Sequence, residues 1–491
     1  MTTRDGADVV IIGTGAAGAT AARVLTEAGV DTVLIEEGPS VPTNELRGDL
    51  YSGMKRVWRD MGGQLAHGRS FIPILQASCV GGTTAINGAI IRRLPTEIYD
   101  LWRREHGFAF SYEELERVWD TLDRELGVAE PPDPVRGGNN RLLAEATRAL
   151  GIGGNWIQRN VKGCEGKARC LQGCPTERKQ SMNVSYIPRA IAAGARLYPT
   201  CRARRLQVKG GRAIGVEAEF VDRPGKSLFV EARRAVIVAA SAIQTPLFLQ
   251  ENGIGRRSGQ VGRRFQAHPG TAVIGRFDEK VDLWFGATQG YESDHYWNER
   301  MKFETLALPV ELGAVRLPGV GPELMHQLAD YGHLAQWAVQ VRARAHGRVR
   351  SGLAGGATIS YDPTDEDVQT LKLGVKRLTE LLFAAGAREV LPGVHGLPDR
   401  IRSFDEIRPI DALPDDPRLF HCVATHLFGT AVMGTDPARS VVNPFGEAHE
   451  LSGLFVADSS YFPTNLGVNP QHTIAAVAWL IAEQIANAPR R

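Results

Sequence analysis

The chain has 491 residues, 43% of them hydrophobic and 23% charged, which is an ordinary balance for a globular enzyme with room for two domains. A formal net charge of +2, without a long basic run, argues against nucleic acid as a partner. The most apolar stretch, residues 474–481, is too short to span a bilayer, so no membrane span is expected.

The beginning of the chain and its cysteine content bear on the compartment. The first predicted strand begins by Ala7, which leaves no room for a cleavable signal peptide. Six cysteines in a chain of this length are not the framework of a disulfide-rich secreted protein. We therefore expect a cytoplasmic protein. Arginine far outnumbers lysine among the 57 basic residues, which favours a GC-rich bacterial genome as the source.

Residues 8–36 have the pattern of a strand, a glycine-rich turn, a helix and a second strand. Gly13 permits the sharp turn, Gly15 lets the backbone approach a pyrophosphate, and Gly18 lets the helix pack closely on the strand. The N-terminus of the helix then offers free N–H groups to phosphates. Glu36 ends the second strand, where an acid can bind ribose hydroxyls. The pattern predicts a dinucleotide site but does not separate FAD from NAD.

Two further stretches follow this unit. Residues 41–75 show no clear period, and we expect a long excursion of the chain over the cofactor. Residues 78–88 are rich in small side chains that let the backbone pass close to a flat ligand, and Asn87 can offer it an amide. Helical spacing then predicts helices over residues 98–106 and 112–126, the second opened by a capping box from Ser111.

The middle of the chain reads as β-structure that returns to a helix. A hairpin is predicted over residues 205–220, followed by a fully apolar strand over 235–240 that suits a parallel sheet. Residues 241–246 then turn into a helix. Residues 261–269 are predicted to be a loop at a domain boundary, with His268 as a loop residue.

The C-terminal third contains one long amphipathic helix and a segment with several polar side chains. The helix is predicted over residues 365–385, with Thr364 as its cap. A strand over residues 453–458 ends in Asp458, and a loop then leads to the last helix, over 474–486.

Four stretches in this order resemble the glucose–methanol–choline (GMC) oxidoreductase family, which binds FAD: Asp8–Gly38, Gly81–Asn87, Ala235–Pro246 and Gly453–Thr473. The resemblance implies an α/β fold, with a doubly wound FAD-binding domain assembled from separated segments and a substrate domain with an antiparallel sheet and helices. We expect the FAD-binding domain to comprise residues 1–105, 180–270 and 448–491. The substrate domain then comprises residues 106–179 and 271–447. Because no second glycine motif follows a strand, an enzyme that binds both FAD and NAD is not expected.

The resemblance also implies the site residues. Cofactor contacts fall on Gly13, Gly15, Gly18, Glu36, Gly82, Thr83, Asn87, Asp458, Asn469 and Pro470. The active-site base falls on His426, three residues before Gly429 as in the family's His-x-x-Gly pattern, and the second active-site position falls on Asn469. Some members attach FAD covalently through a histidine, but residues 84–88 contain none, so FAD is expected to bind non-covalently.

These residue types suit the oxidation of an alcohol to an aldehyde or ketone by hydride transfer to flavin. An imidazole can take the hydroxyl proton because its pKa lies near neutrality. A neutral amide can orient the alcohol oxygen without repelling that proton. We expect a small-molecule alcohol as substrate and O₂ or an unidentified carrier as electron acceptor. His421 and His472 are expected to be structural.

Three cysteines, Cys164, Cys170 and Cys174, lie close enough in sequence to ligate an iron–sulfur cluster. The loop resembles one that holds a cluster in membrane-associated sugar dehydrogenase subunits of the family, although the first spacing differs. It also resembles the cysteine-rich loop of long-chain alcohol oxidases. We expect no metal, with free thiols or a strained disulfide in its place.

The substrate is predicted from residues 284–299, where aromatic and acidic side chains interleave: Trp284, Phe285, Tyr291, Tyr296 and Trp297 with Glu292, Asp294 and Glu299. Aromatic faces pack on sugar rings, and carboxylates accept hydrogen bonds from hydroxyls or pair with amines. The stretch favours a sugar, a glycoside or an amino sugar, although its aromatics can instead fill the core of the domain. The alternatives are a long-chain or sterol alcohol, a flavin-containing lyase without net redox change, and an electron-transfer subunit.

Overall fold

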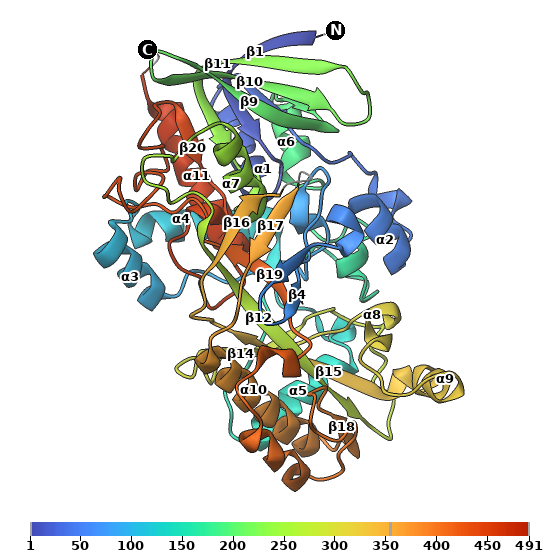
Figure 1. The fold of residues 1–491 in the computed structure, drawn as a ribbon. Helices are drawn as coiled ribbons and strands as arrows, with labels where there is room; N and C mark the ends of the chain where they lie inside the picture. The colour runs from blue at the N-terminus through green and yellow to red at the C-terminus, as the bar shows by residue number, and fades with distance from the viewer. Residues whose placement is uncertain (1, 353–355, 490–491) are drawn as a thin grey trace.

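The computed structural model describes residues 2–352 and 356–489. A first sheet lies near both termini, and a second, larger sheet lies at the other end of the molecule (Figure 1). The strands β16 (Gly347–Ser351), β17 (Ala357–Ser360) and β19 (Val423–Phe428) belong to the second sheet and lie between the two ends.

The first sheet has a parallel part and an antiparallel hairpin. The parallel strands are β8 (Arg196–Tyr198), β2 (Thr32–Ile35), β1 (Thr2–Ile12), β11 (Ser227–Val238) and β20 (Leu454–Val456). The hairpin of β9 (Cys201–Lys209) and β10 (Arg212–Phe220) extends it beyond β11, as the sequence predicts. The apolar ends of β1 and β11 are fully buried, which is typical of parallel strands covered on both faces.

Helices cover this sheet and complete its core. They are α1 (Ala16–Glu27), α6 (Tyr186–Ala192), α7 (Ser241–Glu251) and α11 (Gln471–Asn487). Strand β1 begins at Thr2, five residues before Ala7, because its polar first half pairs with β11 from Ser227 onward. The backbone of a distant strand forms this pairing, so the side chains of residues 2–6 show no hydrophobic pattern that would predict a strand.

The second sheet is built around β12 (Arg263–Arg276), which pairs with β15 (Leu334–Val341), β16, β18 (Glu389–Leu391) and β19. Beyond β15 lie β14 (Met301–Thr305), β13 (Tyr291–Ser293) and β6 (Asn155–Trp156), and beyond β16 lie β17, β3 (Leu65–His67) and β4 (Phe71–Pro73). Helices α5 (Gly138–Ala149) and α10 (Asp365–Ala384) pack on one face. The alternate residues of β15, Gln336, Ala338 and Gln340, are left to face the other side.

The remaining elements surround these sheets. The helices are α2 (Leu50–Val57), α3 (Thr96–His106), α4 (Tyr112–Leu126), α8 (Val310–Ala314) and α9 (Pro322–Ala329), and β5 (Val128–Ala129) pairs with β7 (Arg159–Asn160). The predicted capping boxes of α4, from Ser111, and of α10, from Thr364, are both present. Within the described residues, no helix is long and apolar enough to cross a bilayer.

The loop predicted over residues 261–269 is wrong, because β12 begins at Arg263. The strand is hidden in the sequence because its polar side chains Gln266 and His268 are buried inside the protein and do not alternate with exposed positions. A register shift against β19 between Ala267 and Pro269 accommodates the proline. Helix α2 was also missed; Asp49 caps it by accepting a hydrogen bond from Ser52 N at 2.8 Å.

The fold class is as expected. The domain boundaries remain a prediction, and three elements do not follow them. Helix α4, assigned to the substrate domain, packs its apolar face into the core of the first sheet. Strands β3 and β4, assigned to the FAD-binding domain, pair with the second sheet. Strand β12 runs through the predicted boundary at residue 270. Contacts between residues far apart in the sequence decide to which domain a helix or strand belongs, and no local sequence pattern reveals these contacts.

Candidate active site

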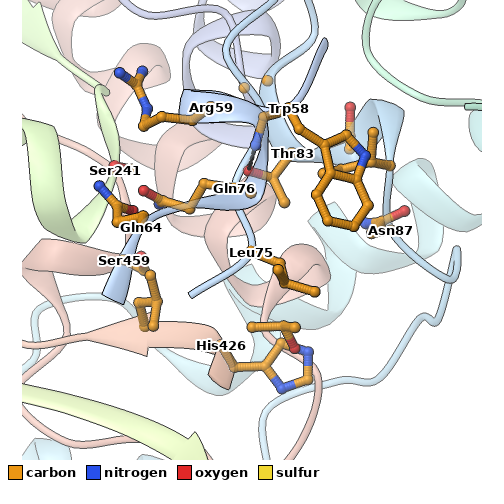
Figure 2. A pocket seen from close by; sticks show the side chains of 18 of the residues that line it. Trp58, Arg59, Gln64, Leu75, Gln76, Thr83, Asn87, Ser241, His426 and Ser459 are labelled. Atoms are coloured by element: carbon orange, nitrogen blue, oxygen red, sulfur yellow. Dashed lines mark hydrogen bonds between the residues drawn. The ribbon is translucent and has the colours of Figure 1, made fainter. Parts of the chain in front are cut away.

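A cavity of about 740 Å³ extends from the glycine turn after β1 to the second sheet. One wall comes from residues 54–64, the segment expected to run over the cofactor, and includes Trp58 and Arg59. His426 points into the cavity from β19, across from Trp58 and Arg59 (Figure 2). The far end is formed by β12, β14 and β15.

The three glycines of the turn adopt the arrangement that a dinucleotide requires. Gly13 has a φ of +98°, which favours glycine, and a Cβ on Gly18 would lie 1.9 Å from the carbonyl oxygen of Gly13. Gly15 has no neighbour within 4 Å of the position of a Cβ. Gly82 packs on Gly15, because its Cβ would lie 2.8 Å from Gly15 Cα. The backbone at Gly15 is therefore open for a phosphate to approach.

Glu36 lines the cavity and also holds the glycine turn. Its carboxylate accepts hydrogen bonds from Thr14 N at 3.0 Å, Thr14 Oγ1 at 2.7 Å and Gly38 N at 2.8 Å. Burial raises the pKa of Glu36. Thr14 Oγ1 in turn accepts from Gly81 N at 3.0 Å, which joins the turn to the segment of Gly82, Thr83 and Asn87.

Thr83 and Asn87 lie on the cavity wall (Figure 2). Thr83 Oγ1 accepts from Ala77 N at 3.2 Å, and the amide of Asn87 donates to the side chain of Gln471. Behind them the buried Lys179 donates to the carbonyl oxygens of Ala85 and Asn87, at 2.8 and 2.9 Å. No sequence pattern pointed to this lysine, which holds the backbone of the segment in place.

Asp458 and Pro470, from the C-terminal part of the chain, reach the same cavity. Asp458 accepts hydrogen bonds from Ser241 N at 2.9 Å and Ser460 N at 2.8 Å. Its carboxylate therefore joins the start of α7 to the loop after β20, and burial raises its pKa.

The structure brings His426 and Asn469, 43 residues apart, within contact of each other: His426 Nε2 lies 3.4 Å from Asn469 Nδ2. Asn469 Oδ1 accepts a hydrogen bond from Lys302 Nζ at 2.7 Å. This bond determines the orientation of the amide, since the oxygen faces the ammonium and the N–H group faces His426.

Lys302 is 1% exposed and was not recognised in the sequence. Besides Asn469, its ammonium contacts Glu304 at 2.7 Å and Glu292 at 2.5 Å, so the buried charge is compensated. Burial and the nearby charge of Lys302 lower the pKa of His426 to about 3. The imidazole of His426 is therefore neutral at physiological pH, but its pKa is not near neutrality as expected from the sequence, so it is a weaker base than an ordinary imidazole.

His268 was predicted to be a loop residue, but it lies on β12 and is 2% exposed. Its Nδ1 is 3.2 Å from Nδ1 of His426, and its Nε2 accepts a hydrogen bond from Gly467 N at 2.9 Å. Burial and His426 lower the pKa of His268 well below its ordinary value. Nε2 also lies 3.2 Å from Asn465 Oδ1, so both ring nitrogens of His268 contact polar groups inside the protein.

His472 and His421, the two histidines expected from the sequence to be structural, do not contact His426 or His268. His472 stacks on Trp119, and its Nε2 lies 2.9 Å from the carboxylate of Asp123, on the side of α4. His421 lines the cavity, where its Nδ1 is 3.0 Å from Arg316 Nη1.

The cysteine loop lies behind the cavity wall. Trp58 Nε1 donates to Leu171 O at 3.2 Å, and Leu171 lines the cavity. Cys170 Sγ is 3.2 Å from Arg159 Nη2, and the positive charges of Arg159 and Lys179 lower the pKa of Cys170 against the effect of burial. In the part of the chain that the structure describes, Cys164, Cys170 and Cys174 are free thiols, and no group of three or more His, Cys, Asp or Glu could hold a metal ion.

The aromatic and acidic stretch at residues 284–299 does not form the substrate pocket. Among the described residues that line the cavity, none belongs to this stretch except Gln289. Glu292 is buried against Arg92 and Lys302, and Asp294 also pairs with Arg92. Because both carboxylates form ion pairs within the protein, they do not support the binding of an amino sugar.

The cavity fits the expected FAD. Amide atoms of Gln64, Gln76 and Gln471 line it, are shielded from solvent, and have no hydrogen-bond partner among the described residues. A heterocycle with alternating donors and acceptors satisfies such amides. Together with the open backbone at Gly15, they fit the ring system and the pyrophosphate of a flavin dinucleotide.

Comparison with known proteins agrees with this geometry. Residues 7–270 and 345–478 match the N- and C-terminal parts of the GMC oxidoreductase family. An uncharacterized GMC-type oxidoreductase of Mycobacterium tuberculosis is 35% identical over 484 residues, which cover 97% of this chain and 75% of that protein. A long-chain-alcohol oxidase of Arabidopsis thaliana is 28% identical over 514 residues, which cover 98% of this chain and 68% of the oxidase.

The same architecture occurs in a solved structure. Pyridoxine 4-oxidase from Mesorbium loti superposes with a TM-score of 0.74 at 18% identity, and the match covers 97% of this chain and 99% of that one. This likeness establishes the fold, in which both sheets take part.

Proposed function

The chain belongs to the GMC oxidoreductase family and is an FAD-dependent alcohol oxidoreductase, and we propose that His426 and Asn469 carry out its reaction. The observation that supports this most directly is the contact of the two side chains in the cavity, at 3.4 Å, with the amide of Asn469 oriented by Lys302.

In this proposal His426 is the base. Its Nε2 faces Asn469 and the cavity, whereas its Nδ1 contacts His268. A neutral imidazole in this position takes the proton of the substrate hydroxyl. FAD, when bound, would supply the acceptor for the hydride on the carbon that bears this hydroxyl group. The electrons then pass to O₂ or to an unidentified carrier.

Asn469 orients the alcohol. Because Lys302 holds its oxygen, the amide N–H group is free to donate to the hydroxyl oxygen of the substrate. The ammonium of Lys302 lies directly behind this amide, so it also stabilises negative charge that develops on that oxygen as the proton leaves.

The cofactor is held non-covalently in this proposal. The backbone at Gly13 and Gly15 binds the pyrophosphate, Gly18 lets the helix pack closely behind them, and Glu36 binds the ribose. Gly82, Thr83, Asn87, Asp458, Asn469 and Pro470 contact the remainder of the FAD.

The lining of the cavity favours an alcohol with an apolar body. Leu75, Leu306, Leu308, Leu312 and Val315 all line it. Together with the likeness to a long-chain-alcohol oxidase, they support an aliphatic alcohol in place of the sugar, glycoside or amino sugar expected from residues 284–299. A polyhydroxylated substrate remains the second candidate, because the buried amide of Gln336 on the cavity floor has no partner among the described residues and suits a hydroxyl.

The test is anaerobic mixing of the FAD-loaded protein with matched panels of aliphatic alcohols, sterols and sugars, followed by the flavin absorption. Bleaching by aliphatic alcohols is expected, and bleaching by sugars alone would reverse the substrate assignment. A yellow protein that no alcohol bleaches would indicate a lyase. Formation of hydrogen peroxide in air distinguishes O₂ from a separate carrier as acceptor.

A further inference from the structure

Arg316 differs from the other arginines of the cavity. Arg59, Arg202 and Arg204 line it near the glycine turn, and each pairs with a carboxylate, of Glu37 or Glu219. Arg316 also lines the cavity, but no carboxylate of the described residues lies within ion-pair distance of it. It is therefore the cation in this wall whose charge the chain itself leaves uncompensated.

The contacts of Arg316 hold its guanidinium in place without neutralising it. Nη1 lies 3.0 Å from His421 Nδ1, Nη2 donates to the carbonyl oxygen of Ala272, and Thr271 Oγ1 is 3.5 Å from Nη2. Nε is shielded from solvent and has no hydrogen-bond partner among the described residues. Burial lowers the pKa of Arg316 to about 10, so the charged form is destabilised until an anion joins it.

The position of Arg316 relative to the base follows from β12. His268, which contacts His426, and Ala272, which contacts Arg316, are both on this strand and four residues apart. At the usual rise of a strand, this separation is about 13 Å. An anion at Arg316 would thus lie on the order of 10 Å from a carbon held beside His426.

The cavity wall near Arg316 is aliphatic and includes one buried polar side chain. Leu308, Leu312 and Val315 come from the same short segment as Arg316 and line the cavity with it. Gln336, 1% exposed, lies on the neighbouring strand, where it pairs with Ile274, two residues beyond Ala272. Both polar atoms of its amide lack a partner in the described structure, so it can donate a second hydrogen bond to an anion.

We propose that Arg316 binds the carboxylate of a hydroxy acid whose hydroxyl group lies at His426, with Gln336 as a second donor to that carboxylate. The inference rests on the proposed function for the end of the substrate that reacts. The carboxylate itself is unchanged in the reaction: the carbinol gives its proton to His426 and its hydride to FAD. Arginine suits this role because its guanidinium stays charged at neutral pH and because its Nε has no acceptor among the described residues.

The experiment compares substrates that differ only in the anionic group, with the FAD-loaded protein. One pair is ω-hydroxyoctanoate and octanol, and the other is glucuronate and glucose, so an aliphatic and a polyhydroxylated acid are distinguished. We expect a KM for ω-hydroxyoctanoate at least ~10-fold below that for octanol, on the scale of a hydrogen bond to a charged group. Arg316→Gln should remove this preference and leave the limiting rate of flavin reduction unchanged, and Arg316→Lys should retain part of it.

The control is Arg408→Gln, which removes an arginine that is 74% exposed in its side chain and lies outside the cavity. It should leave both KM values as in the unaltered protein. Equal KM values for octanol and ω-hydroxyoctanoate in the unaltered protein would overturn the inference and leave the proposed function intact. An equal rise of both KM values in Arg316→Gln would also overturn the inference.

A binding measurement separates the inference from the proposed function. Octanoate has no hydroxyl group and cannot react, so its binding is followed by the change in the absorption of oxidised flavin. It should bind the unaltered protein at least ~10-fold more tightly than Arg316→Gln. If no alcohol bleaches the flavin, the proposed function fails, and octanoate binding alone decides the inference. Octanoate that binds both proteins equally would refute it.

Discussion

Lys302 and Asn469 form the hydrogen bond on which the geometry of the site depends. Nζ of Lys302 lies 2.7 Å from Oδ1 of Asn469, and the amide N–H group consequently faces His426. The lysine is itself compensated by Glu292 and Glu304. A charge network inside the second sheet therefore orients the amide of Asn469, which in the proposed function meets the substrate.

The first prediction concerns the base. His426→Ala should retain FAD, because His426 belongs to the substrate end of the cavity, and should slow flavin reduction by at least ~10²-fold, the scale of losing a general base. Stopped-flow absorption after anaerobic mixing measures the rate. His395→Ala, at an exposed position outside the cavity, is the control and should be unaffected. An unchanged rate in His426→Ala would transfer the role to His421.

The second prediction concerns pH. The base acts in its neutral form, and burial and Lys302 lower the pKa of His426 to about 3. The limiting rate of flavin reduction should therefore not fall as the pH is lowered from about 8 to 5, whereas an ordinary imidazole would lose activity near its usual pKa of about 6.5. Lys302→Met removes the charge that lowers the pKa, so the loss of activity should move to higher pH. A profile that falls near pH 6.5 in the unaltered protein would contradict this assignment.

The third prediction concerns His268 as a positioning residue. His268→Leu removes the contact with Nδ1 of His426, which leaves the imidazole free to rotate. Flavin reduction should slow by roughly 10-fold, within the range for a general base that is misplaced, while KM stays within about twofold. Steady-state and stopped-flow kinetics separate the two quantities. A parallel change in KM, or none in the rate, would mean that His268 only fills space.

The fourth prediction concerns the attachment of FAD. Residues 84–88 contain no histidine that could bond covalently to the flavin. In this segment Asn87 instead forms a hydrogen bond with the side chain of Gln471. Acid precipitation should therefore release all the flavin into the supernatant, where its absorption is measured. A yellow protein pellet would show a covalent link.

Local patterns in the sequence were enough for the framework and for the residues that the family motifs contain. The glycine turn, the capping boxes of α4 and α10 and the hairpin of β9 and β10 depend on neighbours within a few residues, so their patterns survive in the sequence. His426, three residues before Gly429, and Asn469, next to Pro470, were recognised because each stands in a short motif.

The sequence by itself thus determined the fold class, the dinucleotide turn and two candidate catalytic residues. Only the tertiary structure placed His268, Lys302 and Arg316 beside the cavity and buried Glu292 in an ion pair. These positions depend on the register of strands that are far apart in sequence. In a sheet, a shift of one residue moves a side chain to the opposite face, so a polar residue on a strand shows its role only once its partners are known.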